Sequence, residues 1–212
     1  MIMSAETHSP IDSVLDRVSQ APRLWNILRW LVEAGFVGER RVIASELEPW
    51  RDVGQRRFLD FGCGTGEFAR DFPAAHYVGM DLSTTYLRFA AQARGGSYMA
   101  SSGDALALAD RSFDAALVLG VLHHLPDNIA AAAMVELQRV LRPGASALVI
   151  EDVPPPTLWN LPGHLIHAID RGGYIRDDAA YRALFGPGFA VEKRFHMRSG
   201  ICDYGVYLLR RH

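Results

Sequence analysis

The chain comprises 212 residues, of which 49% are hydrophobic and 22% charged, a composition typical of one globular domain and unlike that of a disordered or fibrous protein. Its formal net charge of -2 gives no general attraction for a polyanion, and no basic patch stands out, so we expect no nucleic-acid partner. The two cysteines lack the spacing of a disulfide framework or a zinc site, which predicts no metal and favours a reducing cytoplasm.

The N-terminal segment, residues 1–55, is expected to form a helical lid. Residues 1–20 have no continuous apolar run and carry acidic residues, which disfavours a secretory signal, and no later run is long enough to span a membrane. Apolar residues at helical spacing predict an amphipathic helix over 22–33, and a second helix is predicted over 42–47, before a polar connection at 50–55. We expect the first helix to face the core; peripheral contact with a membrane surface is the alternative.

Strands alternate with helices through the middle of the chain, residues 56–152. The predicted strands are 58–61, 77–80, 97–100, 113–119 and 145–150. The predicted helices begin at Glu67, cover 84–94, and cover 129–141 before a turn at 142–144. This alternation predicts an α/β fold with a parallel sheet, and the nearly continuous apolar run at 113–119 predicts a central strand covered on both faces.

The C-terminal part departs from that alternation. Two predicted strands, 189–197 and 203–210, are joined by residues 198–200, which leave no room for a helix, so they must pair as an antiparallel hairpin covering 189–212. The insertion at 153–188 begins with a proline run that predicts a loop. No repeat or linker divides the chain, and we expect one domain.

A glycine-rich turn follows the first strand. Gly62, Gly64 and Gly66 let the backbone bend sharply and approach a ligand closely, which favours a nucleotide-like ligand. Asp81 ends the second strand, where a carboxylate can accept hydrogen bonds from ribose hydroxyls. Glu67 stands where a dinucleotide fingerprint requires its third glycine, so a pyrophosphate would meet a carboxylate there. A nucleoside-type ligand, which has no phosphate groups, fits this turn better.

Four segments resemble, in order and spacing, the successive motifs of class I S-adenosylmethionine-dependent methyltransferases. They are FLDFGCGTGEFA, YVGMDLS, GDALALADRSFDAALVLGVLHHLPD and LQRVLRPGASALVIED, which together span about residues 58–152. The resemblance implies a Rossmann-like, seven-stranded, mostly parallel sheet with a reversed C-terminal strand and helices on both faces. It also implies S-adenosyl-L-methionine as the cofactor. The hairpin predicted independently from the tail agrees with this fold.

The resemblance implies roles for the residues that match the family motifs. It places Asp60, Gly62 and Gly64 around the methionine portion, Asp81 and Leu82 at the ribose, Asp104 and Ala105 at the adenine, and Leu119 and Gly120 beneath the cofactor, with Cys63 and Gly66 completing the turn. Structural alternatives remain open: Asp60 bridges the turn, Asp81 caps the next helix, and Asp104 lies in a surface loop. Cys63 is interpreted as a small turn residue rather than a nucleophile.

Methyl transfer from a sulfonium is an in-line displacement and needs a general base only when the acceptor must lose a proton. His123 and His124 follow the fourth strand at the ligand-binding edge of the sheet, and we take His124 as the candidate base. The alternative is that the pair structures the turn before residues 125–127. Glu151 and Asp152, at the end of the next strand, are the second candidates.

The acceptor site is expected between the N-terminal helices and the insertion at 153–188. The insertion contains Trp159, His164, His167, Tyr174 and Tyr181. These side chains suit an aromatic or lipid-like small molecule, and packing of a cap over the sheet is the alternative. The Asn- or Asp-Pro-Pro-aromatic motif typical of nucleic-acid base methyltransferases does not follow the fourth strand. A non-catalytic S-adenosylmethionine-binding protein and a NAD(P)-dependent oxidoreductase are the alternative functions, and the oligomeric state is left open.

Overall fold

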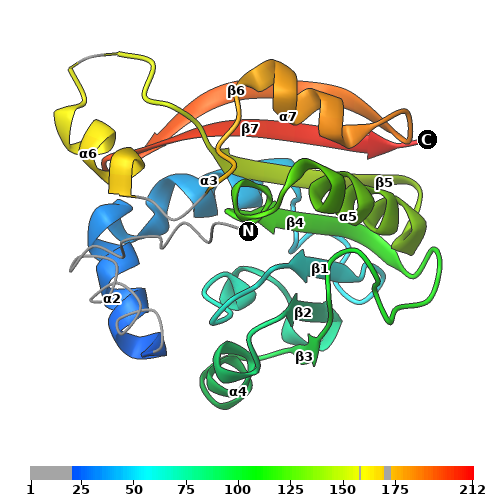
Figure 1. Cartoon of the computed structure of the whole chain (residues 1–212). Coiled ribbons are helices and arrows are strands. Elements are labelled where there is room, and N and C mark those ends of the chain that lie inside the picture. Colours follow the sequence, from blue (N-terminus) through cyan, green and yellow to red (C-terminus); the bar gives the residue numbers. More distant parts are fainter. Residues whose placement is uncertain (1–20, 158, 170–172) are drawn as a thin grey trace, which may run out of the picture.

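A computed structural model describes residues 21–157, 159–169 and 173–212. Within these residues one sheet of seven strands runs through the molecule in the order β3-β2-β1-β4-β5-β7-β6 (Figure 1). The strands are β1 (Phe58–Phe61), β2 (Tyr77–Asp81), β3 (Ser97–Ala100), β4 (Phe113–Leu119), β5 (Leu141–Asp152), β6 (Phe189–Ser199) and β7 (Cys202–Arg211). Pairs among β1 to β5 are parallel, whereas β7 is antiparallel to both β5 and β6. The predicted fold class and the C-terminal hairpin are confirmed.

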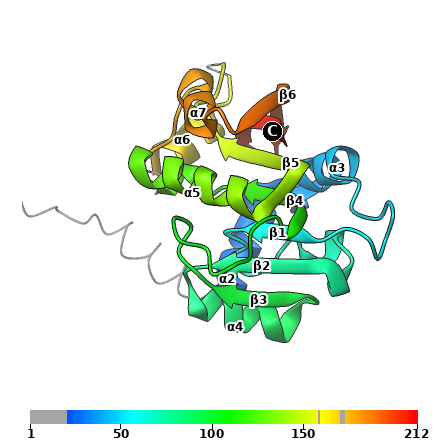
Figure 2. The same cartoon turned by 90° about the vertical axis from the view of Figure 1, so that its right-hand side faces the viewer.

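Helices cover both faces of this sheet (Figure 2). The α-helices are α2 (Pro22–Val32), α3 (Val37–Glu46), α4 (Thr84–Ala93), α5 (Asp127–Val140), α6 (Leu161–Ile169) and α7 (Asp178–Phe185), and the short 3-10 helices are η1 (Ala34–Phe36), η2 (Ala69–Asp71), η3 (Ala74–His76) and η4 (Leu122–His124). One core cluster joins α5 and α7 to one face, and the other joins α3 and η2 to the opposite face. Strand β4 is buried between them, as its apolar sequence predicted.

The predicted helix beginning at Glu67 is wrong, because η2 is the only helical turn between the glycine-rich turn and Pro73 among the described residues. Gly66 has a φ of 68° and keeps the chain out of the right-handed helical region up to that point. Phe72 precedes Pro73 and is extended, with φ -121° and ψ 154°. Five residues remain between these two constraints, too few for a stable helix.

Two other boundaries differ from the sequence prediction. Helix α3 begins at Val37 rather than at residue 42. It directly follows Phe36, whose left-handed φ of 61° marks the start of the helix. Helix α5 ends at Val140, and the predicted turn at 142–144 lies inside β5, which starts at Leu141. The pairing of β4 with β5 shifts register at this point. The residues predicted as a turn therefore form a bulge within the strand.

The apolar stripe of α2 points outward, in contrast to the predicted core-facing orientation. Leu24, Ile27, Leu28 and Leu31 are all exposed at helical spacing. Hydrogen bonding from the neighbouring turn holds the helix in place: the Thr65 hydroxyl donates to Oδ1 of Asn26 at 2.6 Å. In the described parts of the chain, no helix has the length and apolar character needed to cross a membrane. The predictions for residues 1–20 lie outside the described residues.

The insertion divides into two parts with different surroundings. Helix α7 belongs to the core: Tyr181 is fully buried and Phe185 packs edge-on against Tyr207, with ring centroids 5.2 Å apart. Helix α6 lies near α2 at one end of the molecule (Figure 1) and carries exposed apolar side chains, with Trp159 just before it 93% exposed. The described part of the insertion therefore supplies both sheet packing and an exposed apolar rim.

Candidate cofactor and acceptor site

The predicted cofactor residues gather at the carboxyl ends of four adjacent strands, β3, β2, β1 and β4. Backbone hydrogen bonds join these ends: Gly62 and Cys63 donate to the Met80 carbonyl at 2.9 and 2.8 Å, and Ser101 donates to the Asp81 carbonyl at 3.2 Å. These hydrogen bonds hold the loops after the strands together at one edge of the sheet. Open α/β sheets bind their ligands at this edge.

Three glycines of the turn share left-handed backbone angles but differ in what surrounds them. A Cβ atom on Gly62 would lie 2.4 Å from Cγ2 of Val121, and one on Gly66 would lie 2.8 Å from the Tyr98 hydroxyl. These two positions therefore need glycine for close packing. A Cβ on Gly64 would meet only Cδ2 of Tyr86, at 4.0 Å, so the space in front of Gly64 is open. That open space is the part of the turn that fits a ligand.

The side chain of Asp81 is hydrogen-bonded to the same turn. One carboxylate oxygen accepts the Gly64 N–H at 2.8 Å and the other accepts the Ser83 N–H at 2.7 Å. The N-cap of α4 is Ser83, whose hydroxyl accepts from the Tyr86 N–H, so the alternative role of Asp81 as the helix cap is wrong. Each carboxylate oxygen keeps a second lone-pair direction, which leaves Asp81 able to accept ribose hydroxyls.

Asp60 occupies a different environment, inside the sheet. Its carboxylate accepts a 2.5 Å hydrogen bond from the Tyr77 hydroxyl, and the residue is buried. Burial raises the pKa of Asp60 to about 7, although the Tyr77 hydroxyl favours the ionised form. Cys63 is also buried, and this raises the pKa of its thiol far above the usual value, in keeping with its interpretation as a turn residue rather than a nucleophile.

The remaining predicted cofactor residues line the rim of this edge. Leu82 is exposed directly after Asp81, as a residue facing a ligand should be. Asp104 and Ala105 lie in the exposed loop after β3, where the Ser102 hydroxyl donates to the Asp104 carboxylate. Leu119 is buried at the end of β4, and Gly120 donates its N–H to the Ile150 carbonyl at 2.9 Å. The structure therefore brings all these positions to one edge of the sheet.

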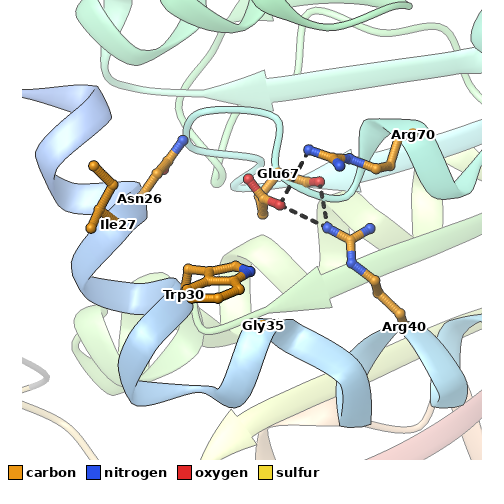
Figure 3. Close-up of a pocket in the computed structure, with 7 residues that line it drawn as sticks. All are labelled: Asn26, Ile27, Trp30, Gly35, Arg40, Glu67 and Arg70. Carbon is orange, nitrogen blue, oxygen red and sulfur yellow. Dashed lines mark hydrogen bonds and ion pairs between the residues drawn. The ribbon is translucent and has the colours of Figure 1, made fainter.

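The carboxylate of Glu67 points toward Arg40 and Arg70 (Figure 3). Its carboxylate pairs with Arg40 at 2.7 Å and Arg94 at 2.5 Å, and Arg70 lies 3.6 Å away. A cavity of about 290 Å³ lies beside it, lined by Asn26, Ile27, Trp30, Gly35, Arg40, Glu67 and Arg70. This cavity includes none of the predicted cofactor residues. The Glu67 ion pairs connect α3, the glycine-rich turn and the end of α4.

The two histidines after β4 have opposite surroundings. His123 is buried, and its Nδ1 lies 2.8 Å from Oε2 of the fully buried Glu151. The same carboxylate also accepts backbone N–H groups of Val121, Leu122 and His123 at 2.9, 2.8 and 3.2 Å. His124, the candidate base, is exposed and its ring centroid lies 4.0 Å from that of His123. The sequence singled out the pair but did not indicate which member is buried.

Arg176 was missed by the sequence analysis. It is 7% exposed and donates to the carbonyls of Leu122, Leu125 and Tyr174 at 2.7, 2.6 and 2.9 Å. It also pairs with Asp127 at 2.7 Å. The insertion thereby holds η4 and the start of α5 in place. No local pattern identifies this arginine, because its partners other than Tyr174 lie about fifty residues away in the chain.

Asp152 stands next to Glu151 at the open end of β5. Its Oδ2 lies 3.5 Å from Nε2 of His123, and its side chain is 23% exposed. Arg29, on α2, is close enough to interact electrostatically with Asp152, and Glu33 pairs with Arg29 at 2.7 Å. Tyr204, on β7, pairs in register with Asp152, and burial raises the pKa of its hydroxyl well above the usual range. Charged side chains from α2, β5 and η4 thus meet beside the predicted cofactor edge.

Comparison with known proteins gives a consistent result. A family model described as "Methyltransferase domain" matches residues 59–149. The chain is 35% identical over 185 residues to the ubiquinone/menaquinone biosynthesis C-methyltransferase UbiE of Syntrophotalea carbinolica, covering 81% of this chain and 75% of that protein. It is also 35% identical over 147 residues to the demethylmenaquinone methyltransferase of Thermus thermophilus, covering 64% of each. The match thus spans slightly less than two thirds of the second relative.

A solved structure agrees at the level of the fold. The crystal structure of a SAM-dependent methyltransferase from Methanosarcina mazei superposes with a TM-score of 0.61 at 19% sequence identity, covering 80% of this chain and 96% of that one. At this identity the likeness supports the fold alone.

Proposed function

The chain belongs to the class I S-adenosylmethionine-dependent methyltransferases, and from this membership we propose that it methylates a ring carbon of a quinol-type, lipid-like acceptor. Membership makes it a methyltransferase, and the quinone-biosynthesis relatives indicate a small or lipid-like acceptor. The quinol-type ring is a more specific proposal. It is supported by the match to the UbiE protein, which covers 81% of this chain. The Thermus relative, named for demethylmenaquinone, supports the same class of acceptor.

The cofactor edge fits S-adenosylmethionine on features of the structure itself. The bound cofactor supplies an electrophilic methyl group on a sulfonium. We assign the open space at Gly64, with Asp60, Gly62, Cys63 and Gly66, to its methionine portion. Asp81 and Leu82 receive the ribose, Asp104 and Ala105 the adenine, and Leu119 and Gly120 the lower side of the cofactor. Acidic Asp81 and the absence of a phosphate-binding fingerprint in the turn suit a cationic ligand without phosphates.

Exposed apolar side chains on two helices at one end of the molecule support a lipid-like acceptor. Leu28 and Leu31 on α2 and Leu161 and Leu165 on α6 are exposed, and Figure 1 shows both helices at the same end of the molecule. An apolar tail lying along such side chains is removed from water, which stabilises binding by roughly 25 cal/mol per Å² of buried apolar surface.

The test is a transfer assay with methyl-labelled S-adenosylmethionine and chemically reduced demethylmenaquinone as acceptor. We expect a labelled product with the methyl group on a ring carbon, established by mass spectrometry and NMR. Labelled transfer only to acceptors without a quinol-type ring would contradict the proposed acceptor. Saturable cofactor binding with no transfer to any acceptor would favour the non-catalytic alternative. Thermal stabilisation by NAD(P), but not by S-adenosylhomocysteine, would favour the oxidoreductase.

A further inference from the structure

Three side chains form a continuous line from the protein interior to the acceptor side: Glu151, His123 and Asp152. Glu151 is fully buried, His123 is 4% exposed, and Asp152 is 23% exposed. The contacts along the line are 2.8 Å from Glu151 to Nδ1 and 3.5 Å from Nε2 to Asp152. We call these three residues the β5 relay. Among them, Asp152 alone has a substantial surface for contact with an acceptor.

Glu151 determines the orientation of the proton on His123. Its two carboxylate oxygens accept three backbone N–H groups of residues 121–123. Because these oxygens already act as acceptors, we assign Nδ1 of His123 as the donor in the 2.8 Å contact. In the neutral imidazole this leaves the Nε2 lone pair directed toward Asp152. The relay therefore has a proton-accepting nitrogen behind its outermost carboxylate.

Charged residues from several elements surround the relay. Among the described residues, Arg29 interacts with Glu33 and Asp152, and His123 contacts Glu151 and Asp152. A proton that reaches the Asp152–His123 pair is attracted by the neighbouring carboxylates, because opposite charges attract strongly in a poorly solvated site. The cluster is thus arranged to accept a proton.

Other groups that face the relay do not serve as the base. Tyr204 on β7 and Tyr181 on α7 keep their protons, because burial raises the pKa of each hydroxyl. Cys202 on β7 is likewise held as a thiol, because burial raises its pKa to about 12. Arg29 on α2 stays cationic beside Glu33. Among the described residues, His124 is a further titratable neighbour of His123 and is compared directly below.

Resting on the quinol-type acceptor argued for above, we propose that Asp152 is a catalytic base, that His123 shares the proton it receives, and that Glu151 is a positioning residue. The hydroxyl O–H bond of the acceptor breaks and its proton moves to the Asp152 carboxylate. The electron pair left on oxygen delocalises into the ring, and the ring carbon forms its bond to the methyl carbon as the S–C bond breaks and leaves its pair on sulfur. The hydrogen on the methylated ring carbon then leaves as a proton, the oxygen regains one, and Asp152 releases its proton to water.

The experiment compares two acceptors in the full chain with labelled S-adenosylmethionine. One is a naphthohydroquinone, whose hydroxyls are neutral at the assay pH; the other is a nitro-substituted naphthol that is already ionised. We expect Asp152→Asn to lower kcat about 100-fold with the hydroquinone, the usual range for a general base, and less than about threefold with the ionised naphthol. His123→Gln should show the same selectivity with a loss of about 10-fold.

Two controls and a variant of the alternative base, His124, are measured together with these two variants. S-adenosylhomocysteine affinity by calorimetry should be unchanged in Asp152→Asn, which excludes unfolding of the cofactor edge. Asp110→Asn, at an exposed ion pair with Arg139 away from the site, should leave both rates unchanged. His124→Ala tests the rival base. Equal losses on both acceptors in Asp152→Asn, or selective loss in His124→Ala instead, would overturn the relay.

The two proposals fail in different ways. Methylation of naphthols but not of any hydroquinone, with Asp152→Asn slowing transfer to neutral naphthols and not to the ionised one, would contradict the quinol-type acceptor and support the relay. Methylation of the hydroquinone with Asp152→Asn as active as the unmodified chain would support the acceptor and overturn the relay. No transfer to any hydroxyl-bearing ring would contradict both.

Discussion

The carboxylate of Asp81 accepts a 2.8 Å hydrogen bond from the backbone N–H of Gly64. The residue at the end of β2 that we assign to the ribose therefore also fixes the turn at the end of β1 that we assign to the methionine portion. Because one side chain performs both tasks, changes at Asp81 should affect cofactor affinity and the stability of the turn together.

Asp81→Ala should weaken S-adenosylhomocysteine binding by about 100-fold, because hydrogen bonds to a charged group contribute roughly 1.5–3 kcal/mol each. It should also lower the free energy of unfolding by about 1–2 kcal/mol, since Gly64 loses its acceptor. Calorimetry and urea denaturation measure the two effects. Asp104→Ala, in the exposed loop, is the matched comparison and should leave stability unchanged. Unaltered affinity in a folded Asp81→Ala protein would refute the ribose assignment.

Gly62→Ala and Gly64→Ala should separate packing from binding within one turn. Both glycines have positive φ, 74° and 52°, so each substitution costs about 1–2 kcal/mol in backbone strain. In Gly62→Ala the new Cβ would also overlap Val121 at 2.4 Å, which raises the total loss to about 3 kcal/mol or more. In Gly64→Ala the Cβ enters open space, so we expect a smaller stability loss but strongly weakened cofactor binding. Equal cofactor affinity in Gly64→Ala and the unmodified chain would count against the proposed site.

Glu39→Gln should remove a pH dependence of stability. Glu39 is fully buried on α3; one oxygen accepts the Ser199 hydroxyl at 2.6 Å, and the other has no hydrogen-bond partner among the described residues. Burial, with the nearby Glu33 carboxylate, raises the pKa of Glu39 from 4.5 to about 7. The folded state thus binds this proton more tightly than the unfolded state does. The resulting stability is fully present below about pH 4.5 and is lost as the pH rises through about 7.

The Glu39→Gln protein should therefore be more stable than the unmodified chain at pH 8 by about 2 kcal/mol, with little difference at pH 5. Urea denaturation at both pH values gives the comparison. Asp60 also has a pKa raised to about 7 by burial, but it is present in both proteins and cancels in the difference. Glu48→Gln, at an exposed glutamate, is the control. A stability difference that does not change with pH would be inconsistent with a buried acid at position 39.

Arg176→Ala should destabilise the protein by about 3 kcal/mol, because it leaves three carbonyls and Asp127 without the guanidinium that they share. It should also lower kcat, since Arg176 holds η4, which carries His123, while leaving S-adenosylhomocysteine affinity unchanged. The control is Arg182→Ala, whose exposed ion pair with Asp178 contributes about 0.5 kcal/mol or less. Similar stability losses in the two variants would contradict the role of Arg176.

The sequence predicted the sheet well because each strand carries its own signal. The boundaries of β1, β3 and β4 agree with the predicted ranges, and β2 differs by one residue, since apolar runs between turn residues are local patterns. The glycine-rich turn and Asp81 were also identified locally, from spacing along a continuous segment. The same reasoning failed after Gly66, where the constraint from Pro73 outweighed an apparently helical pattern.

Sequence by itself therefore identified the family and the parallel sheet with its reversed end, and it predicted which residues bind the cofactor, because these features depend on period, turn chemistry and spacing. Tertiary structure alone decided that His123 rather than His124 is buried against Glu151, that Arg176 ties the insertion to η4, and that the apolar stripe of α2 faces outward. Each of these depends on which distant segments pack together. Burial and charge pairing between residues far apart in the chain leave no periodic pattern for sequence analysis to detect.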